Sequence, residues 1–287
     1  MISEMNETLL IARDYDLAAT LTSGQAFRWI PRRGRWESIL HGRYVSLQQL
    51  PEGIEARTLE PQIDWNWLRE YLQIETDLDL VLETFPKDAP MQTAVRACRG
   101  LRLLRQEPWE CLASFILSST KQIVQIQQIV KALCECYGEE IPGSEGMQHT
   151  FPSAARLAGL SESNLRACKM GFRAPYLLET ARIIDSGGLD LEALRLMSTN
   201  EARQALMDLP GVGEKIANCV LLFAYGFQDA FPVDVWVQKA IAQLYFPKRR
   251  PTRKRLKRFV ETHFGPNAGY AQQYLFHYMR TRVRNAQ

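Results

Sequence analysis

The sequence predicts an α+β protein in which a small N-terminal antiparallel β domain precedes an all-helical body. Up to about residue 63, short segments rich in β-branched and aromatic residues alternate with glycine- and proline-containing turns. From Asp64 onward, apolar residues recur at three- and four-residue spacings, which is typical of amphipathic helices. We therefore expect a β domain over residues 1–85, which includes the start of the helical region, and a helical body over residues 86–287.

The N-terminal segments are short enough to form a meander of neighbouring antiparallel strands. We expect these strands at residues 25–30, 35–40, 44–47 and 53–59. The helical pattern begins at Trp65 and Leu68 and continues strongly through residues 113–133. Breaks at later glycines and prolines divide the remainder into several helices, and no internal repeat is visible.

The composition is that of a globular protein, with 46% hydrophobic and 23% charged residues among 287. The first sixteen residues lack the basic start and apolar run of a signal peptide, and no apolar run approaches the length of a membrane span. The six cysteines are scattered without the spacing of a metal knuckle, which indicates reduced thiols. We expect a monomer that needs no membrane and is cytoplasmic or nucleoid-associated.

The positive charge is concentrated in one place. The net charge is +3, from 35 basic and 32 acidic residues, and the run from Lys248 to Arg258 holds eight of the basic residues and no acid. Without that run the net charge would be −5, since 27 basic residues would face 32 acidic ones. Local positive charge suits a polyanion such as a nucleic acid. A solvated stretch around a helix start is an equally good interpretation of this run.

The stretch LPGVGEKIA, residues 209–217, predicts a tight glycine-rich turn that leads into a helix. We expect Gly211 and Gly213 to adopt backbone conformations closed to other residues. Their N–H groups and those of the helix start can then converge on an anion, for which a DNA phosphate is suitable. With the preceding helix, this would form a helix-hairpin-helix, although an ordinary helix–turn–helix remains the alternative.

Two charged residues near this turn are candidates for chemistry. Lys215 lies on the first turn of the second helix, where an amine is either a phosphate contact or a nucleophile activated by its surroundings. Cys219 is four residues further on and therefore on the same helix face. Asp234, in FPVDVWV, is either a helix N-cap or a carboxylate directed at a forming cation, and the two roles are compatible.

Four segments together resemble one enzyme family. LPGVGEKIANC, followed by an aspartate nineteen residues after the lysine, resembles the helix-hairpin-helix/Gly-Pro-Asp superfamily of DNA glycosylases. SGQAFRW at residues 23–29, MGFRAPY at 170–176 and FGPNAGYAQQYLF at 264–276 are similar to segments of the 8-oxoguanine DNA glycosylase family. These segments stand in the family's order and extend from about residue 20 to 280.

The resemblance implies a bifunctional glycosylase and AP lyase that excises 8-oxoguanine from duplex DNA. Lys215 would attack C1′ of the damaged nucleotide, expel the base and form a Schiff base, and β-elimination would follow. Asp234 would stabilise the positive charge on the sugar and help to position the lysine. No organic cofactor and no catalytic metal would be needed. Family members bind a cation at hairpin carbonyls, which here belong to Met207, Leu209 and Val212.

The resemblance also implies a pocket for a base flipped out of the duplex. The carbonyl of Gly24 would accept the N7–H of 8-oxoguanine, whereas guanine has an acceptor at that atom. Gln272 would bind the Watson–Crick edge of the base, Phe276 would stack on one face and Cys219 would lie on the other. Without the resemblance, Phe276 and Cys219 would be read as core and Gly24 as a strand bulge.

Contacts to the opposite strand are implied as well. Phe172 and Arg173 match an aromatic wedge and an arginine that act at the gap left by the flipped base. Thr120 and Gln125 stand where vertebrate members carry an asparagine and an arginine that reads the opposite cytosine, so we expect a relaxed opposite-base preference. Trp236 replaces a histidine that lies near a phosphate.

Two other functions remain open at this point. One is a helix-hairpin-helix glycosylase for another damaged base, against which the SGQ and AQ-x-x-LF segments speak. The other is a non-catalytic DNA-binding module that uses the hairpin to hold phosphate. Such a module has no need of the pair formed by Lys215 and Asp234.

Overall fold

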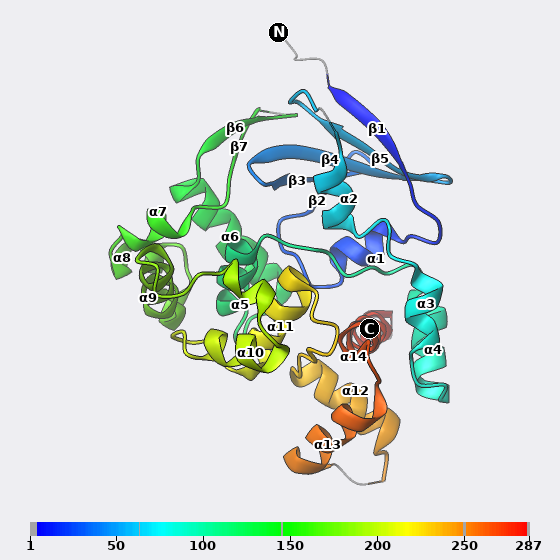
Figure 1. Cartoon of the computed structure of the whole chain (residues 1–287). Coiled ribbons are helices and arrows are strands. Elements are labelled where there is room, and N and C mark those ends of the chain that lie inside the picture. The colour runs from blue at the N-terminus through cyan, green and yellow to red at the C-terminus, as the bar shows by residue number, and fades with distance from the viewer. Residues whose placement is uncertain (1–4, 63, 145, 249–250, 286–287) are drawn as a thin grey trace.

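The computed structural model describes residues 5–62, 64–144, 146–248 and 251–285. A five-stranded antiparallel sheet is followed by a body made mainly of helices, as the sequence predicts. In Figure 1 the sheet lies near the top of the view, and helices α12 (Val235–Tyr245) and α13 (Arg253–His263) lie at the bottom. No helix in the described part of the chain combines the length and the apolar character that crossing a membrane requires.

The sheet is a meander to which the first strand is added at one edge. Its spatial order is β1-β5-β4-β3-β2, and every neighbouring pair is antiparallel. The strands are β1 (Asn6–Ile11), β2 (Ile30–Arg32), β3 (Arg35–Leu40), β4 (Arg43–Leu50) and β5 (Gly53–Thr58). The pairing of β1 with β5 joins segments more than forty residues apart, and the local sequence pattern did not predict it.

The predicted strand over residues 25–30 is wrong. Only Ile30 belongs to a strand, β2, and residues 23–29 form an irregular segment that follows the short helix α1 (Leu17–Thr22). The cause lies in Gln25, whose side-chain amide donates to the carbonyls of Thr20 and Arg102 at 3.0 and 2.8 Å. Its side-chain oxygen accepts from the amide of Leu104 at 2.7 Å, so the segment is held by the interior rather than by a partner strand.

The remainder of the chain is built from helices with one small hairpin. The first helices are α2 (Asn66–Leu72), α3 (Leu78–Glu83), α4 (Ala89–Cys98), α5 (Pro108–Leu117) and α6 (Ile123–Tyr137). The later ones are α7 (Ala154–Ala158), α8 (Glu162–Ala167), α9 (Ala174–Asp185), α10 (Thr199–Met207), α11 (Glu214–Val220), α12, α13 and α14 (Ala268–Asn285). Short 3-10 turns at Gly171–Arg173 and Ala193–Leu196 and a π-helical turn at Leu221–Tyr225 complete the body.

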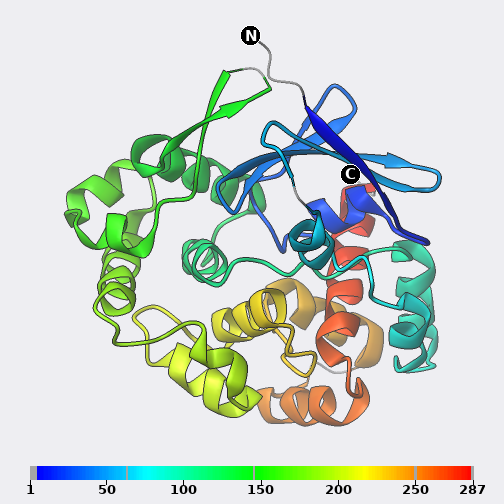
Figure 2. The same ribbon diagram turned by 45° about the horizontal axis from the view of Figure 1, so that its top comes forward.

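The hairpin of β6 (Glu140–Gly143) and β7 (Gly146–His149) was not predicted from the sequence. It extends from the helical body and contacts β4 of the sheet. Figure 2 shows it beside the sheet at the top of the view. The helical body is therefore not purely helical, although the α+β class is confirmed.

Two buried apolar clusters support the site. One lies between the sheet and α2 and includes Leu47, Ile54 and Leu68. The larger cluster fills the helical body, where α11 packs against α5 and α12 packs against α14. These two contacts bring together segments from four different parts of the sequence.

Candidate active site

The glycine-rich turn forms the predicted helix-hairpin-helix. Helix α10 ends at Met207, and α11 begins at Glu214 after a turn closed by the bond from the Val212 amide to the Leu209 carbonyl at 3.1 Å. Gly211 has φ +76°, and a Cβ there would lie 2.7 Å from Cγ of Tyr176. Both the backbone and the close approach of this aromatic ring therefore require glycine at this position.

For Gly213, the expectation of a backbone conformation closed to other residues is wrong. Its φ is −98°, which any residue can adopt, and no atom lies within 4 Å of the position of a Cβ. Gly213 is the N-cap of α11, and the space beside it is open. An approaching group can therefore come close to the backbone of the helix start.

Lys215 lies half-buried on the first turn of α11 and points toward the end of α5. Its Nζ donates to the hydroxyl of Ser118 at 3.0 Å and lies 5.2 Å from the centre of the Phe115 ring. Ser118 is the C-cap residue of α5, so two helices fix the position of the amine. The sequence interpretation had missed Ser118 as a partner of the lysine.

Asp234 is the N-cap of α12, and its carboxylate accepts from the amide of Val237 at 2.7 Å. Burial raises the pKa of this carboxyl, against the opposing effects of the Val237 amide and of the positive charge on Lys215. Asp234 is therefore both a helix cap and a partly desolvated carboxylate within the electrostatic reach of the lysine.

Cys219 completes this wall of the site. Its side chain is buried, and burial raises the pKa of the thiol to about 11, so the thiol is neutral at pH 7. The charges of Lys215 and Asp234 also act on this pKa, in opposite directions. The structure thus brings together the three residues that the sequence singled out on α11 and α12.

Gly24 lies in the turn that follows α1, with φ +84°. A Cβ there would lie 2.8 Å from Cδ1 of Ile123, 3.2 Å from Nη1 of Arg280 and 3.4 Å from Cε1 of Phe276. Glycine is therefore favoured by the backbone conformation, and a side chain there would also displace the ends of the Ile123 and Arg280 side chains. The alternative of a strand bulge is wrong, because no strand is present at this position.

The carbonyls of the residues around Gly24 accept hydrogen bonds from side chains of the protein. Arg280 donates to the carbonyl of Thr22, Gln273 to that of Ser23 at 3.1 Å and Gln106 to that of Gln25 at 2.7 Å. Among the residues that the structure describes, none donates a hydrogen bond to the carbonyl of Gly24. Of the backbone carbonyls of residues 22–25, that of Gly24 is therefore the one without a donor in the described part of the chain, and it can accept from a ligand.

Helix α14 presents a second available acceptor. Gln272 is 3% exposed, and its side-chain oxygen has no hydrogen-bond partner among the described residues. Phe276 lies one helical turn further on, beside Gly24. A buried amide oxygen without a partner is costly, so this oxygen is available to accept a hydrogen bond from a ligand.

The residues predicted at the opposite strand form a separate group. Phe172 is 53% exposed in the 3-10 turn before α9, as a wedge requires, whereas Arg173 is 2% exposed. Arg173 donates to the hydroxyl of Thr120 at 2.5 Å, to the carbonyl of Met170 at 3.2 Å and lies over the Phe172 ring. Burial lowers the pKa of this guanidinium.

Thr120 and Gln125 differ in how their side chains are used. Thr120 is exposed, has φ +59° and accepts the bond from Arg173. Gln125 forms a capping box at the start of α6, where its side-chain oxygen accepts from the amide of Gln122 at 3.1 Å. The sequence interpretation assigned Gln125 to the DNA and did not foresee this helix cap.

Three further predictions concern Trp236, the cation site at the hairpin and the basic run, and they remain predictions. Trp236 is half-buried on α12, with Nζ of Lys239 5.2 Å from its ring. The proposed cation site at Met207, Leu209 and Val212 lies along the hairpin, and one of its carbonyls already accepts the turn bond. In the basic run, Arg249, Arg250 and the side chain of Arg253 lie outside the described residues, and the remaining basic side chains of α13 are exposed.

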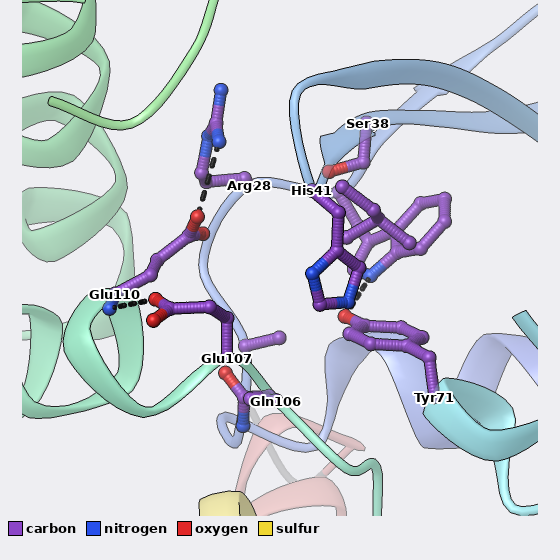
Figure 3. A pocket seen from close by; sticks show the side chains of 10 residues that line it. Arg28, Ser38, His41, Tyr71, Gln106, Glu107 and Glu110 are labelled. Carbon is purple, nitrogen blue, oxygen red and sulfur yellow. Dashed lines mark hydrogen bonds and ion pairs between the residues drawn. The ribbon is translucent and has the colours of Figure 1, made fainter. Parts of the chain in front are cut away.

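A small pocket elsewhere contains none of the site residues predicted from the sequence. Arg28, His41, Tyr71, Glu107 and Glu110 are among its lining residues, and Figure 3 shows Arg28 beside Glu110 and His41 beside Tyr71. Arg28 donates to Glu110 at 3.2 Å, to the Ile39 carbonyl at 3.2 Å and to the His149 carbonyl at 2.5 Å. These bonds join the sheet and the β6–β7 hairpin to α5, the helix that ends at Ser118.

Comparison with known proteins agrees with this geometry. Residues 8–112 match the family model of the 8-oxoguanine DNA glycosylase N-terminal domain, and residues 113–266 match that of the HhH-GPD superfamily of base excision DNA repair proteins. The chain belongs to the 8-oxoguanine DNA glycosylase family.

Members of this family from distant organisms are similar over nearly the whole chain. A probable N-glycosylase/DNA lyase of Methanothermobacter thermautotrophicus is 30% identical over 93% of this chain and 94% of its own. The N-glycosylase/DNA lyase OGG1 of Arabidopsis thaliana is 33% identical over 91% of this chain and 76% of its own. The 8-oxoguanine glycosylase/lyase of Clostridium acetobutylicum, solved with double-stranded DNA that carries cytosine opposite 8-oxoguanine, superposes with a TM-score of 0.89. It is 29% identical, over 99% of this chain and all of the other.

The protein is therefore a base excision repair enzyme, an N-glycosylase with DNA lyase activity. Within this 8-oxoguanine DNA glycosylase, the structure adds Ser118, Tyr176, Gln273 and Arg280 to the residues predicted from the sequence. The helical spacing of Gln272, Phe276 and Arg280, each four residues apart, is a signal by which Arg280 could have been found.

Proposed function

We propose that this enzyme excises 8-oxoguanine from double-stranded DNA with Lys215 as the nucleophile and Asp234 as the stabilising anion. The observation that carries the proposal is the placement of the half-buried amine of Lys215, bound to Ser118, within electrostatic reach of the partly desolvated carboxylate of Asp234. A protein that only binds DNA has no need to bury a carboxylate beside a lysine, since burial of a charge costs free energy.

The reaction begins with the lone pair of the lysine nitrogen. As the bond between C1′ and N9 of the base breaks, positive charge develops on the sugar, and the carboxylate of Asp234 stabilises it. The electron pair of the C1′–N9 bond leaves with the base, the nitrogen of Lys215 bonds to C1′, and one proton passes from that nitrogen to the departing base. The C1′–O4′ bond then breaks, O4′ takes up a proton from water, and the protonated Schiff base remains. Removal of a C2′ proton and departure of the 3′ phosphate complete the β-elimination and cut the strand.

The base is selected by the two acceptors that the protein leaves available. The carbonyl of Gly24 accepts the N7–H that 8-oxoguanine has and guanine lacks, and the buried oxygen of Gln272 accepts from an N–H of the Watson–Crick edge. Phe276 provides the stacking face on α14, and the neutral Cys219 lies on the other face of the base. Guanine would place two acceptors against each other at Gly24, which disfavours it strongly.

The flipped nucleotide leaves a gap, which the exposed ring of Phe172 fills as a wedge. Arg173 lies over this ring and binds Thr120, and in this proposal the two residues act at the opposite base. The hairpin with Gly211 and Gly213 holds the backbone of the damaged strand through the N–H groups of the turn. The basic side chains of α13 contact flanking backbone in this proposal, and Trp236 lies near the phosphate of the damaged nucleotide.

The enzyme acts as a monomer on genomic DNA, in the cytoplasm or the nucleoid, and requires no organic cofactor. A cation at the carbonyls of Met207, Leu209 and Val212 would bridge the hairpin to a phosphate without taking part in the chemistry.

Borohydride trapping tests the proposal. A duplex with one 8-oxoguanine opposite cytosine and an undamaged duplex are incubated with the wild type, with Lys215→Gln and with Lys131→Gln, which removes an exposed lysine of α6. We expect a covalent adduct with the damaged duplex alone, formed by the wild type and by Lys131→Gln and lost in Lys215→Gln. Tight binding by the wild type without an adduct would show that Lys215 is not the nucleophile and that the enzyme uses another mechanism.

A further inference from the structure

Arg280 of α14 touches three parts of the base pocket at once. It follows Phe276 by one helical turn and Gln272 by two, so all three lie on one face of the helix. Its guanidinium donates to the carbonyl of Thr22, and its Nη1 lies 3.2 Å from the place of a Gly24 Cβ. Its Cζ lies 5.6 Å from the centre of the Phe276 ring.

These contacts fix the turn of residues 22–24 to the helix that carries the base-binding side chains. Arg280 and Gln273, both on α14, bind the two carbonyls that precede Gly24. Gln106 binds the carbonyl that follows it, at 2.7 Å. The carbonyl of Gly24 is therefore directed by bonds on both sides, and α14 supplies the two on the N-terminal side.

We propose that Arg280 is a positioning residue that sets the discrimination between 8-oxoguanine and guanine. It does so by holding the Gly24 carbonyl in register with Gln272 and Phe276. The inference rests on the proposed reading of N7–H by Gly24. Both the attraction to N7–H and the repulsion from a bare N7 weaken as the carbonyl moves away, so a looser turn lowers the contrast between the two bases.

Arginine suits this position better than lysine. Its planar group carries several donors in a fixed arrangement, so it can bind a carbonyl while it packs against an aromatic ring. Lysine would retain the charge and one donor to Thr22, but it would lose the contact of the guanidinium with the Phe276 ring. The charge of Arg280 also acts with burial to lower the pKa of His277 to about 4, so the neighbouring imidazole remains neutral.

The test measures binding where no turnover can occur. Three proteins that all carry Lys215→Gln are compared: one keeps Arg280, one has Arg280→Lys and one has Arg280→Met. For each protein, the affinity is measured for a duplex with 8-oxoguanine opposite cytosine and for a duplex with guanine opposite cytosine. Loss of a charged hydrogen bond predicts that the ratio of the two dissociation constants falls about tenfold or more in Arg280→Met and less in Arg280→Lys. Arg282→Met, which removes an exposed arginine from the same helix, should leave the ratio unchanged.

A second readout separates positioning from folding. Cleavage of a duplex with a preformed abasic site requires Lys215 but no base, so Arg280→Met with Lys215 intact should retain this lyase activity within about twofold. Equal loss of lyase and excision activity would reduce Arg280 to a structural residue. If Lys215→Gln distinguishes the two duplexes and the Arg280 variants do so equally well, the inference fails while the proposed function stands. If Lys215→Gln binds both duplexes equally, the proposed base recognition itself fails.

Discussion

The lesion side of the active site, formed by Lys215, Asp234, Gly24 and Gln272, leaves polar atoms available to a ligand. The carbonyl of Gly24 and the side-chain oxygen of Gln272 have no partner among the described residues. The opposite-strand side, formed by Thr120, Gln125, Phe172 and Arg173, binds most of its polar atoms to the protein itself, although the buried Nε of Arg173 has no partner among the described residues. Gln125 caps a helix, and Arg173 donates to Thr120.

This difference suggests where the enzyme is selective. Unpaired buried acceptors make a pocket intolerant of the wrong base, because a mismatch leaves them unsatisfied. Polar groups that already have protein partners gain less from an added ligand, and they would have to exchange one hydrogen bond for another. We therefore expect strict recognition of the damaged base and relaxed recognition of the base opposite it.

The largest effect is expected for Asp234→Asn. Asparagine caps a helix about as well as aspartate, so α12 should begin at the same residue. The charge that stabilises the developing cation is lost, and excision should fall by about 10²–10³-fold. Single-turnover excision of 8-oxoguanine and the melting temperature, measured on the same preparations, check this. A drop in activity explained by a lower melting temperature would show that the carboxylate acts through the fold alone.

Gly24→Ala tests whether base recognition depends on glycine at position 24. The methyl group would strain a backbone conformation with φ +84° and would displace the side-chain ends of Ile123 and Arg280, which lie against the base pocket. We expect excision to fall by about ten- to a hundredfold, with a loss of about 1–2 kcal/mol in the free energy of unfolding. Gly34→Ala is the matched control, since its φ of +79° imposes similar strain with no atom within 4 Å of the new methyl group. Equal excision by the two variants would show that the pocket around Gly24 has no part in base recognition.

The raised pKa of Asp234 predicts the pH dependence of excision. Burial favours the protonated carboxyl, so its folded pKa lies above the unfolded value, and activity is lost as the pH falls through that raised pKa. The stability of the fold changes with pH in the opposite direction. The raised pKa contributes stability that is fully present below the pKa of the unfolded state, and this contribution is lost as the pH rises through the folded pKa. The acid limb of single-turnover excision should lie above the ordinary aspartate value of about 4 and be absent from the residual activity of Asp234→Asn. An acid limb at the ordinary aspartate pKa would contradict the inference that burial raises the pKa of Asp234.

The site illustrates what the sequence alone can predict. Lys215, Cys219 and Asp234 were identified together, because the turn, the helical spacing and the N-cap position are all local patterns. The irregular segment before β2 was mistaken for a strand, since its conformation depends on bonds from Gln25 to residues such as Leu104, far along the chain. Ser118 and Arg280 were missed for the same reason, as their partners are about a hundred residues or more away.

On the opposite-strand side, the sequence gives the residue types but not the contacts that their side chains make within the protein. The sequence shows a glutamine at position 125, but its hydrogen bond to Gln122 exists only once α6 begins at Ile123. In the same way, the exposure of Phe172 and the burial of Arg173 beside it depend on the turn that they share. Adjacent residues in one motif therefore differ in what they can offer to DNA.

Excision opposite each of the four bases measures the expected relaxation on this side. With no arginine at position 125 to read cytosine, the rates of 8-oxoguanine excision opposite C, A, G and T should lie within about tenfold of one another, since one bidentate base contact is worth about 1–3 kcal/mol. Single-turnover rates at equal saturation separate this selectivity from differences in binding. A strict requirement for cytosine would show that Arg173 and Thr120 suffice to read it.

The smallest effect distinguishes the two roles of Gln125. Gln125→Ala removes one half of the capping box, because the amide of Gln122 loses its acceptor, and the free energy of unfolding should fall by about 0.5–1 kcal/mol. Gln128→Ala, which truncates an exposed glutamine one turn further along α6, controls for the loss of side-chain volume and should change stability less. If Gln125 stabilises the helix and does not contact the DNA, the ratios of the excision rates opposite the four bases should be the same in both variants. A selective change in the rate opposite cytosine would instead return Gln125 to the DNA interface, and the contrast between the two sides of the site would then lie in Arg173 alone.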